Sequence, residues 1–115
     1  MNENANRVQL DPTKLQHIIE SLVTKLKPQK MILFGSRAEW RAYKESDVDL
    51  LVVLDAPIDL DRGIRFELNS QLSREVGLRI QLIPMAIETY EETKGIIGGI
   101  AYPATKYGVV IYENS

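Results

Sequence analysis

The 115-residue chain contains no cysteine and a single histidine. The absence of cysteine excludes a disulfide scaffold, thiol chemistry and a cysteine-based zinc site, and one histidine is too few for a multi-histidine zinc centre. No apolar run approaches the roughly 20 residues that a membrane-spanning helix needs. The polar segment from Met1 to Leu10 lacks the hydrophobic stretch of a signal peptide. We therefore expect a cytoplasmic protein without disulfides, zinc or a membrane partner.

An excess of basic charge is also lacking. The chain has 14 Lys and Arg against 16 Asp and Glu, a net charge of -2. Direct binding of nucleic acid through a basic surface requires a clear Lys/Arg excess, so this mode of binding is not expected. With 44% apolar and 26% charged residues, the composition is typical of a globular protein. We expect one domain over residues 1–115, with residues 1–9 as a flexible arm.

Three segments show the apolar spacing of helices. The first starts at Asp11, whose carboxylate is placed to cap a helix with proline at its first position, and ends at Pro28. The second runs from residue 59 or 61 to residue 76, where apolar residues step by four. The third is expected from residue 86 to about residue 93. Residues 37–46 are expected to form a short helix and a loop.

Four short apolar runs predict strands. They lie at residues 31–34, 48–54, 78–83 and 108–112, the last of which is expected to be a strand or an extended tail. We expect Pro84 to end the third strand, and the stretch from Gly95 to Pro103 to be irregular. A strand–helix–strand crossover in one sheet is right-handed in nearly all cases, which makes the second and third strands parallel neighbours. The predicted fold class is α/β, with a small mixed sheet flanked by helices.

The segment from Leu33 to Val53, LFGSRAEWRAYKESDVDLLVV, contains the candidate functional residues. Gly35 and Ser36 follow a buried strand, where backbone N–H groups and a hydroxyl suit a phosphate. Asp47 and Asp49 lie two residues apart on a strand, so both carboxylates project from the same face. Two such acids repel unless a cation lies between them, and oxygen ligands favour Mg²⁺. The combination predicts metal-assisted phosphoryl or nucleotidyl transfer.

Each feature alone has a simpler interpretation, because Gly-Ser after a strand is usually a turn and Asp-x-Asp is usually a solvated strand edge or a cap. Asp49, however, shares a strand face with Leu51 and Val53, and that face is normally covered. A covered carboxylate requires a partner, for which a cation is the economical choice.

The string GSR, a ten-residue gap after Gly-Ser and then DVDLLVV resembles the signature of the minimal nucleotidyltransferases of the DNA polymerase β superfamily. The resemblance extends over nearly the whole chain and implies a polymerase-β-like nucleotidyltransferase fold. It implies that Gly35 and Ser36 bind the triphosphate of a nucleotide, for which we expect ATP, and that Arg37 lies near the phosphates or packs on the sheet. It also implies that Asp47 and Asp49 are catalytic and hold two Mg²⁺ ions.

Small stand-alone members of this family resemble the antitoxins of bacterial toxin–antitoxin pairs, which accompany HEPN-type ribonuclease toxins. Some of these antitoxins transfer AMP from ATP to a tyrosine of the toxin. The resemblance therefore implies a HEPN-type toxin as partner and AMPylation as the reaction. A domain of this size has little structure to enclose a nucleotide, so we expect a partner, or a second copy of the chain, to complete the site.

Two positions depart from the family pattern. The third carboxylate, expected on the next strand, aligns with Gln81, whose neutral amide can lend an oxygen to Mg²⁺ but cannot act as a base. Trp40 stands where the family often has glycine. We expect it to cover a nucleotide base, to contact a partner, or to pack on the surface of the domain.

Gln81 leaves two functions open. One is AMP transfer to a tyrosine hydroxyl of the toxin. The other is a catalytically weak or inactive antitoxin that neutralises its partner by binding alone. Transfer to RNA or to a small molecule such as an aminoglycoside is disfavoured, because the chain lacks a basic surface and a substrate domain.

The remaining polar candidates have structural explanations. His17 lies at the boundary of the first helix face, and Glu88, Glu91 and Glu92 are expected on the solvated side of the third helix.

Overall fold

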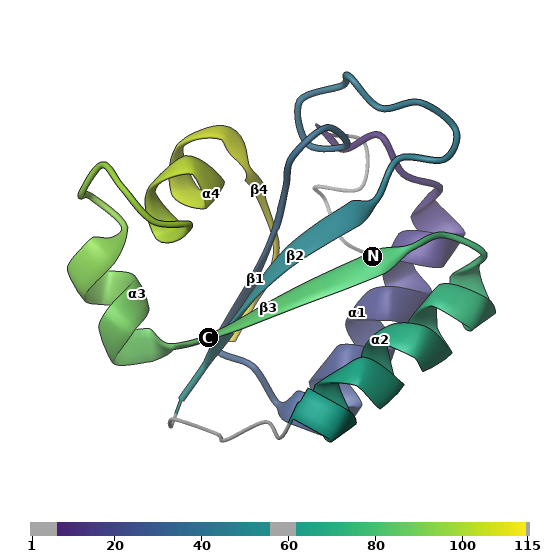
Figure 1. Ribbon diagram of the computed structural model, residues 1–115, viewed down its shortest axis with the longest axis horizontal. Coiled ribbons are helices and arrows are strands. Elements are labelled where there is room, and N and C mark those ends of the chain that lie inside the picture. Colours follow the sequence, from purple (N-terminus) through teal and green to yellow (C-terminus); the bar gives the residue numbers. More distant parts are fainter. Residues whose placement is uncertain (1–6, 56–61, 115) are drawn as a thin grey trace.

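The computed structural model describes residues 7–55 and 62–114. The elements are α1 (Pro12–Leu26), β1 (Lys30–Phe34), β2 (Val48–Leu54), α2 (Arg62–Val76), β3 (Ile80–Ala86), α3 (Ile87–Thr93), α4 (Ala101–Tyr107) and β4 (Val109–Glu113). The four strands form one sheet in the order β3-β2-β1-β4 (Figure 1). β2 and β3 are parallel, whereas β1 is antiparallel to both β2 and β4. The predicted mixed sheet and the parallel pairing of the second and third strands are confirmed.

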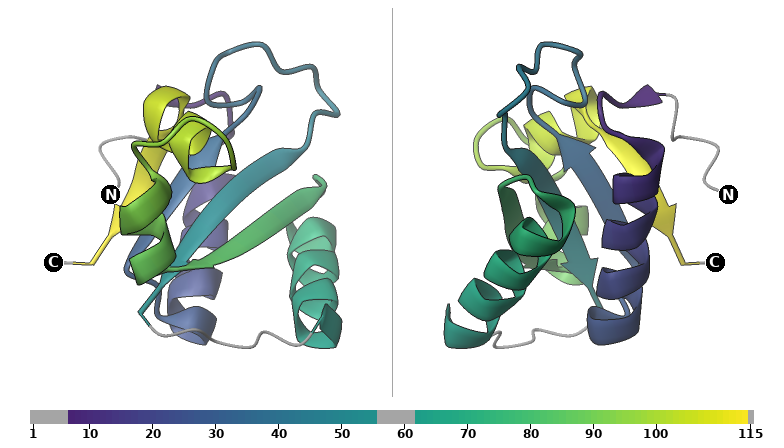
Figure 2. Two further views of the ribbon diagram at one scale, coloured as in Figure 1. Left: turned by 60° about the vertical axis from the view of Figure 1, so that its left-hand side comes forward. Right: turned by 90° about the vertical axis from the view of Figure 1, so that its right-hand side faces the viewer.

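Helices cover both faces of the sheet. α1 and α2 pack on one face, and α3 and α4 lie against the other (Figures 1 and 2). The side chains of β2 alternate between the two cores: Leu50 and Val52 belong to the α1–α2 side, and Leu51 and Val53 to the α3–α4 side. All four are buried, which is why this segment is apolar without interruption. Asp49 is on the α3–α4 side, because side chains alternate along a strand.

The first helix begins as its sequence predicts. The carboxylate of Asp11 accepts hydrogen bonds from the backbone N–H groups of Thr13 (2.8 Å) and Lys14 (3.1 Å), and Pro12 occupies the first turn. These bonds satisfy N–H groups that have no partner within the helix. The helix ends at Leu26, and the capping residue Lys27 adopts a left-handed conformation with φ of 47°.

The prediction that Pro84 ends the third strand was wrong. β3 runs from Ile80 through Pro84 to Ala86, and it lies at one edge of the sheet. Proline is tolerated on an edge strand because its missing N–H can face away from the neighbouring strand.

Two further predictions need correction. The stretch predicted as irregular up to Pro103 already contains the start of α4 at Ala101. Pro103 is compatible with this helix because N–H groups of the first turn have no intrahelical acceptor. Residues 37–46 form turns and irregular backbone, with no short helix. The predicted start of the second helix at residue 59 or 61 lies outside the described residues.

The N-terminal segment packs on the domain from residue 7 onward. Residues 1–9 were expected to form a flexible arm, of which residues 1–6 lie outside the described part. Val8 and Leu10 are buried in the α1–α2 core, and the backbone N–H of Gln9 donates to the carbonyl of Arg37 at 2.7 Å. In the described ranges, the helices are too short or too polar to cross a membrane.

Candidate functional site

The candidate site lies where β1 ends and β2 begins. Phe34, the last residue of β1, pairs with Asp49 near the start of β2, so Gly35 follows directly beside that aspartate. Gly35 has a positive φ of 78°. A Cβ atom at this position would lie 2.6 Å from Oδ2 of Asp49. Glycine is therefore required twice, by the backbone conformation and by the close approach of the carboxylate.

The Gly35-Ser36 segment opens a turn. The backbone N–H groups of Ala38 and Glu39 donate to the carbonyl of Gly35 (3.1 and 3.2 Å), and the N–H of Arg41 donates to the carbonyl of Ser36 (2.9 Å). The chain thus turns next to Asp49 without forming a helix, and Ser36 directly follows the glycine that Asp49 approaches.

The two aspartates repel each other. The pKa of Asp49 is raised above its ordinary value, mainly by burial and then by the negative charge of Asp47. No Lys, Arg or His side chain among the residues described forms an ion pair with either carboxylate. A bound cation would offset both the burial and the repulsion.

Gln81 lies next to Asp49 on the neighbouring strand. The parallel register of β2 and β3 pairs the two residues directly, and paired side chains project from the same face of a sheet. Gln81 is exposed. The available oxygen ligands are therefore two carboxylates and one neutral amide, a donor set that fits Mg²⁺. Throughout residues 7–55 and 62–114, no three His, Cys, Asp or Glu side chains are grouped to hold a metal ion.

Arg37 is buried, with 7% of its surface exposed. Its guanidinium donates to the carbonyls of Gln9 (2.9 Å), Lys44 (3.2 Å) and Ser46 (3.0 and 3.1 Å). These four hydrogen bonds occupy most of the five N–H groups of an arginine. These bonds favour a role for Arg37 inside the loop between β1 and β2, and its placement near the phosphates stays a prediction.

Trp40 occupies a position that suits glycine. Its φ is 56°, a left-handed conformation that L side chains rarely adopt. The indole Nε1 donates to the carbonyl of Arg7 at 3.2 Å, and 61% of the side chain is exposed. The ring therefore lies on the surface of the loop and outside both cores.

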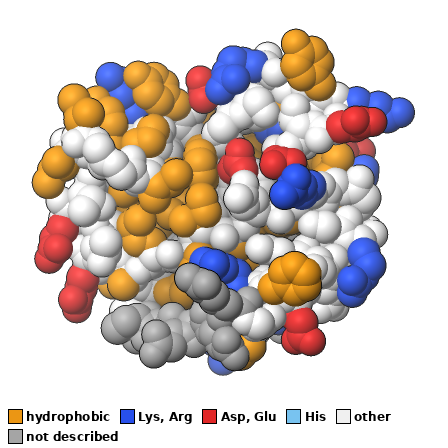
Figure 3. Space-filling view, viewed as in Figure 1, with side chains coloured by type: hydrophobic (Ala, Val, Ile, Leu, Met, Phe, Trp, Pro, Cys, Tyr) orange, Lys and Arg blue, Asp and Glu red, His pale blue; other side chains and the backbone are white. Residues whose placement is uncertain are grey.

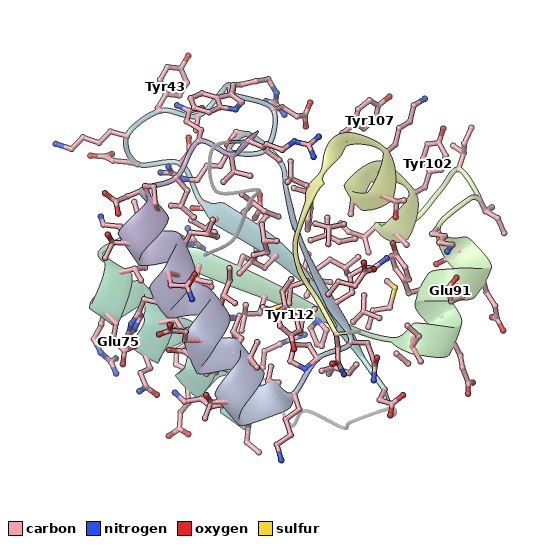
Figure 4. The ribbon with its side chains drawn as sticks, turned by 180° about the vertical axis from the view of Figure 1, so that it is seen from behind. Tyr43, Glu75, Glu91, Tyr102, Tyr107 and Tyr112 are labelled. Atoms are coloured by element: carbon pink, nitrogen blue, oxygen red, sulfur yellow. The ribbon has the colours of Figure 1, made fainter. Side chains whose placement is uncertain are left out.

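The structural explanations given for the other polar candidates agree with the structure. His17 on α1 lies 2.6 Å from Glu75 on α2, and both are exposed. Glu91 pairs with Lys94 on the opposite side of the molecule from Glu75 (Figure 4).

An apolar surface adjoins the acidic side chains at the centre of the molecule. In the space-filling view it extends from these acidic side chains toward α3 and α4 (Figure 3). On this side of the sheet, Phe34, Ile83, Met85 and Ile100 are only partly buried. The site is thus an open sheet end with charge on one side and apolar surface on the other.

Sequence reasoning missed Gln9. Its side chain bonds to Ala42, 33 positions away, and no local pattern marks a residue whose partners are that distant. For Arg37, the only signal was its place directly after Gly-Ser.

Comparison with known proteins places the whole site within one family. The model of the family described as "Polymerase beta, Nucleotidyltransferase" matches residues 16–115. A search of curated proteins gave no match.

Several solved structures share the fold. One chain of a toxin–antitoxin crystallised with AMP-PNP has a TM-score of 0.67 and 22% identity, covering 87% of this chain and 73% of that chain. The toxin–antitoxin MntA-HepT gives a TM-score of 0.61 at 20% identity, and the match covers 90% of this chain and 74% of that chain. A tri-AMPylated Shewanella oneidensis HEPN toxin in complex with MNT antitoxin gives 0.58 at 20% identity, covering 89% and 71%. At these identities the likeness concerns the fold.

Proposed function

Because this chain belongs to the polymerase beta nucleotidyltransferase family, we propose that it is a Mg²⁺-dependent nucleotidyltransferase that transfers AMP from ATP to a tyrosine hydroxyl of a HEPN-type toxin. In this role it is an antitoxin. The observation that carries the proposal is the pair of Asp47 and Asp49 beside Gly35. Asp49 is partly buried and coupled to a second negative charge, an arrangement that is unfavourable for the fold alone and suited to a cation.

Each residue of the site has a proposed part. Asp47 and Asp49 hold two Mg²⁺ ions, with Gln81 able to lend a neutral oxygen beside Asp49. Bound Mg²⁺ would neutralise the triphosphate and orient its oxygens. Gly35 leaves room for a phosphate chain because it has no side chain, and Ser36 offers a hydroxyl to it. Arg37 keeps the loop in place by its bonds to backbone carbonyls.

The proposed reaction forms a bond between the tyrosine oxygen and the α-phosphorus of ATP. The bond between that phosphorus and the pyrophosphate oxygen breaks, and pyrophosphate leaves. The phenolic proton passes to water, because the amide of Gln81 has no basic group at neutral pH.

The proposal of a HEPN-type partner is supported by three of the fold neighbours, which are toxin–antitoxin structures, one of them with an AMPylated HEPN toxin. The open geometry of the site agrees with this partner. Ligand sites normally bury most of the ligand, whereas Gln81 is exposed and Asp47 and Asp49 are only partly buried. A partner would supply both the acceptor tyrosine and the missing wall.

Gln81 favours a second candidate, an antitoxin that acts by binding alone. Its neutral amide stands at the register position beside Asp49 where the family pattern has a carboxylate. Loss of one anionic ligand weakens metal binding, and loss of a base slows deprotonation of the acceptor.

Co-purification with the native partner tests the proposal. The tagged chain and its Asp49→Asn variant are isolated from native cells, and the intact mass of each copurified protein is measured. We expect the partner that copurifies with the wild type to carry added AMP, and the partner that copurifies with Asp49→Asn to carry no AMP. A partner captured equally by both forms and left unmodified would contradict AMP transfer and support binding alone. In that case Gln81→Asp should produce transfer if the chain is an enzyme weakened at this position.

A further inference from the structure

We propose that Gln9 and Arg37 form a clasp, defined as these two side chains and their hydrogen bonds, that positions Asp47 for binding Mg²⁺. The inference rests on the proposed function for the role of Asp47. Gln9 lies outside residues 16–115, the segment that the family model matches. The part of the clasp formed by Gln9 is therefore contributed by the segment that precedes the family match.

The side-chain amide of Gln9 makes two hydrogen bonds to the backbone of Ala42, much as a neighbouring strand pairs with a residue in a sheet. Its Nε2 donates to the carbonyl of Ala42 at 2.9 Å, and its Oε1 accepts from the N–H of Ala42 at 2.9 Å. The backbone of Gln9 adds two bonds: its N–H donates to the carbonyl of Arg37 (2.7 Å), and its carbonyl accepts from Nη1 of Arg37 (2.9 Å). One residue thus holds the loop at two points.

Arg37 extends these contacts to the residue that precedes Asp47. Its Nε and Nη2 donate to the carbonyl of Ser46 at 3.1 and 3.0 Å, and Nη2 also donates to Lys44 at 3.2 Å. Because the side chain is 7% exposed, these bonds are shielded from competition with water. Hydrogen bonds to a charged donor are stronger than those between neutral groups. The position of Ser46, and hence of Asp47, therefore depends on Arg37.

The clasp is anchored in the core of the domain. Val8 and Leu10, on either side of Gln9, are 2% and 8% exposed and belong to the α1–α2 core. Directly after Leu10, Asp11 caps α1. Gln9 therefore connects a fixed part of the molecule to the loop.

The loop needs such a connection, because residues 35–47 contain neither a helix nor a strand. Asp49 is held within β2 by pairing with β1 and β3, but Asp47 precedes the strand. Weakening the clasp should consequently increase the freedom of Asp47 and leave Asp49 in place. Metal affinity should fall because positioning of ligands by surrounding bonds is worth about 10–100-fold in affinity.

The test uses the full chain with Gln9→Met, which keeps the length of the side chain and removes both of its bonds to Ala42. We expect the dissociation constant for Mg²⁺, measured by calorimetry, to rise about 10-fold, with faster hydrogen exchange at the amide of Ala42. Saturating Mg²⁺ should restore the rate of AMP transfer, since the ligands themselves are intact. Gln9→Glu keeps the acceptor for the N–H of Ala42 and should give an intermediate affinity.

Gln16→Met is the matched control. Gln16 is exposed on α1 and donates to Glu20 in the same helix, so its variant should bind Mg²⁺ like the wild type. Unchanged affinity for Mg²⁺ in Gln9→Met, despite faster exchange at Ala42, would overturn the inference, as would a wild type that binds no Mg²⁺. Weaker Mg²⁺ binding in Gln9→Met together with no AMP transfer by the wild type would support the clasp and contradict the proposed function.

Discussion

Gly35 and Asp49 belong to the same sequence motif, and they also lie in close contact in the structure. Gly35 has a positive φ of 78°, and a carboxylate oxygen of Asp49 lies where a Cβ atom of residue 35 would project. Gly77 has a similar φ of 73°, but a Cβ there would meet nothing within 4 Å. The comparison separates backbone strain, which both positions share, from the approach of Asp49, which belongs to Gly35 alone.

Substitution of each glycine by alanine should show this difference. Gly77→Ala is expected to lower the free energy of unfolding by about 1 kcal/mol through left-handed strain. Gly35→Ala should cost about 1–3 kcal/mol more through overpacking, and should abolish the stabilisation by Mg²⁺ because Asp49 is displaced. Chemical denaturation with and without Mg²⁺ measures both effects. Equal losses in the two variants would contradict the close contact.

Trp40 shows how a residue can depart from a family pattern without entering a core. Its positive φ explains why glycine suits the position, and its exposed ring contributes little burial to offset the strain. The bond from its indole to the carbonyl of Arg7 adds to the contacts between the N-terminal segment and the loop.

At the scale of elements, the joint between α4 and β4 is as tightly packed as the site. A Cβ at Gly108 would meet the carbonyl oxygen of Ala104, Cγ2 of Ile32 at 2.7 Å and the carbonyl oxygen of Leu33 at 2.8 Å. Its φ of -88° is ordinary, so sterics and not backbone conformation require glycine here. This joint sets how closely α4 lies to β1.

Gly108→Ala is therefore expected to lower the free energy of unfolding by about 1–3 kcal/mol, since α4 must move away from β1. Gly95→Ala serves as the control, because a Cβ at Gly95 meets nothing within 4 Å and the change should stay within about 0.5 kcal/mol. Thermal and denaturant unfolding of both variants test the expectation. If Gly95→Ala lowered the free energy of unfolding as much as Gly108→Ala does, the packing explanation would be wrong.

At the scale of the whole molecule, one strand connects both cores and the site. β2 buries alternate residues on the two faces of the sheet, and it begins next to the carboxylates. The ionisation of Asp49 is consequently linked to the stability of the entire domain.

Asp49→Asn should raise the melting temperature at pH 7 in the absence of metal. Burial and the charge of Asp47 raise the pKa of Asp49 above its ordinary value of 3.8, so the folded state binds more protons than the unfolded state between the two pKa values. The free energy of unfolding therefore falls as pH rises through this window, and the penalty is complete above the folded pKa. The advantage of the variant should disappear as pH falls toward 3.8.

With Mg²⁺ present, the wild type should melt at a higher temperature than Asp49→Asn. Mg²⁺ raises the melting temperature of the wild type and leaves that of Asp49→Asn nearly unchanged. Asp55→Asn, at an exposed aspartate after β2, should match the wild type with and without Mg²⁺. A variant that melts below the metal-free wild type at pH 7 would contradict the unfavourable ionisation of Asp49.

Much of the fold followed from local patterns in the chain. The cap at Asp11, the alternation of helices and strands, the parallel pairing of β2 with β3 and the extent of β2 were all predicted correctly. Local patterns failed at Pro84 and Pro103, because whether proline interrupts an element depends on the edge position of β3 and on the first turn of α4.

The sequence by itself determined the fold family and the candidate residues of the site, because glycine, carboxylate spacing and apolar periodicity act over a few neighbouring residues. Tertiary structure alone decided that Asp49 lies against Gly35, that Gln81 pairs with Asp49, and that Arg37 is directed toward backbone carbonyls. These relations join residues that lie between 7 and 32 positions apart in the sequence. They depend on strand register and on hydrogen bonds between distant segments, which no local pattern specifies.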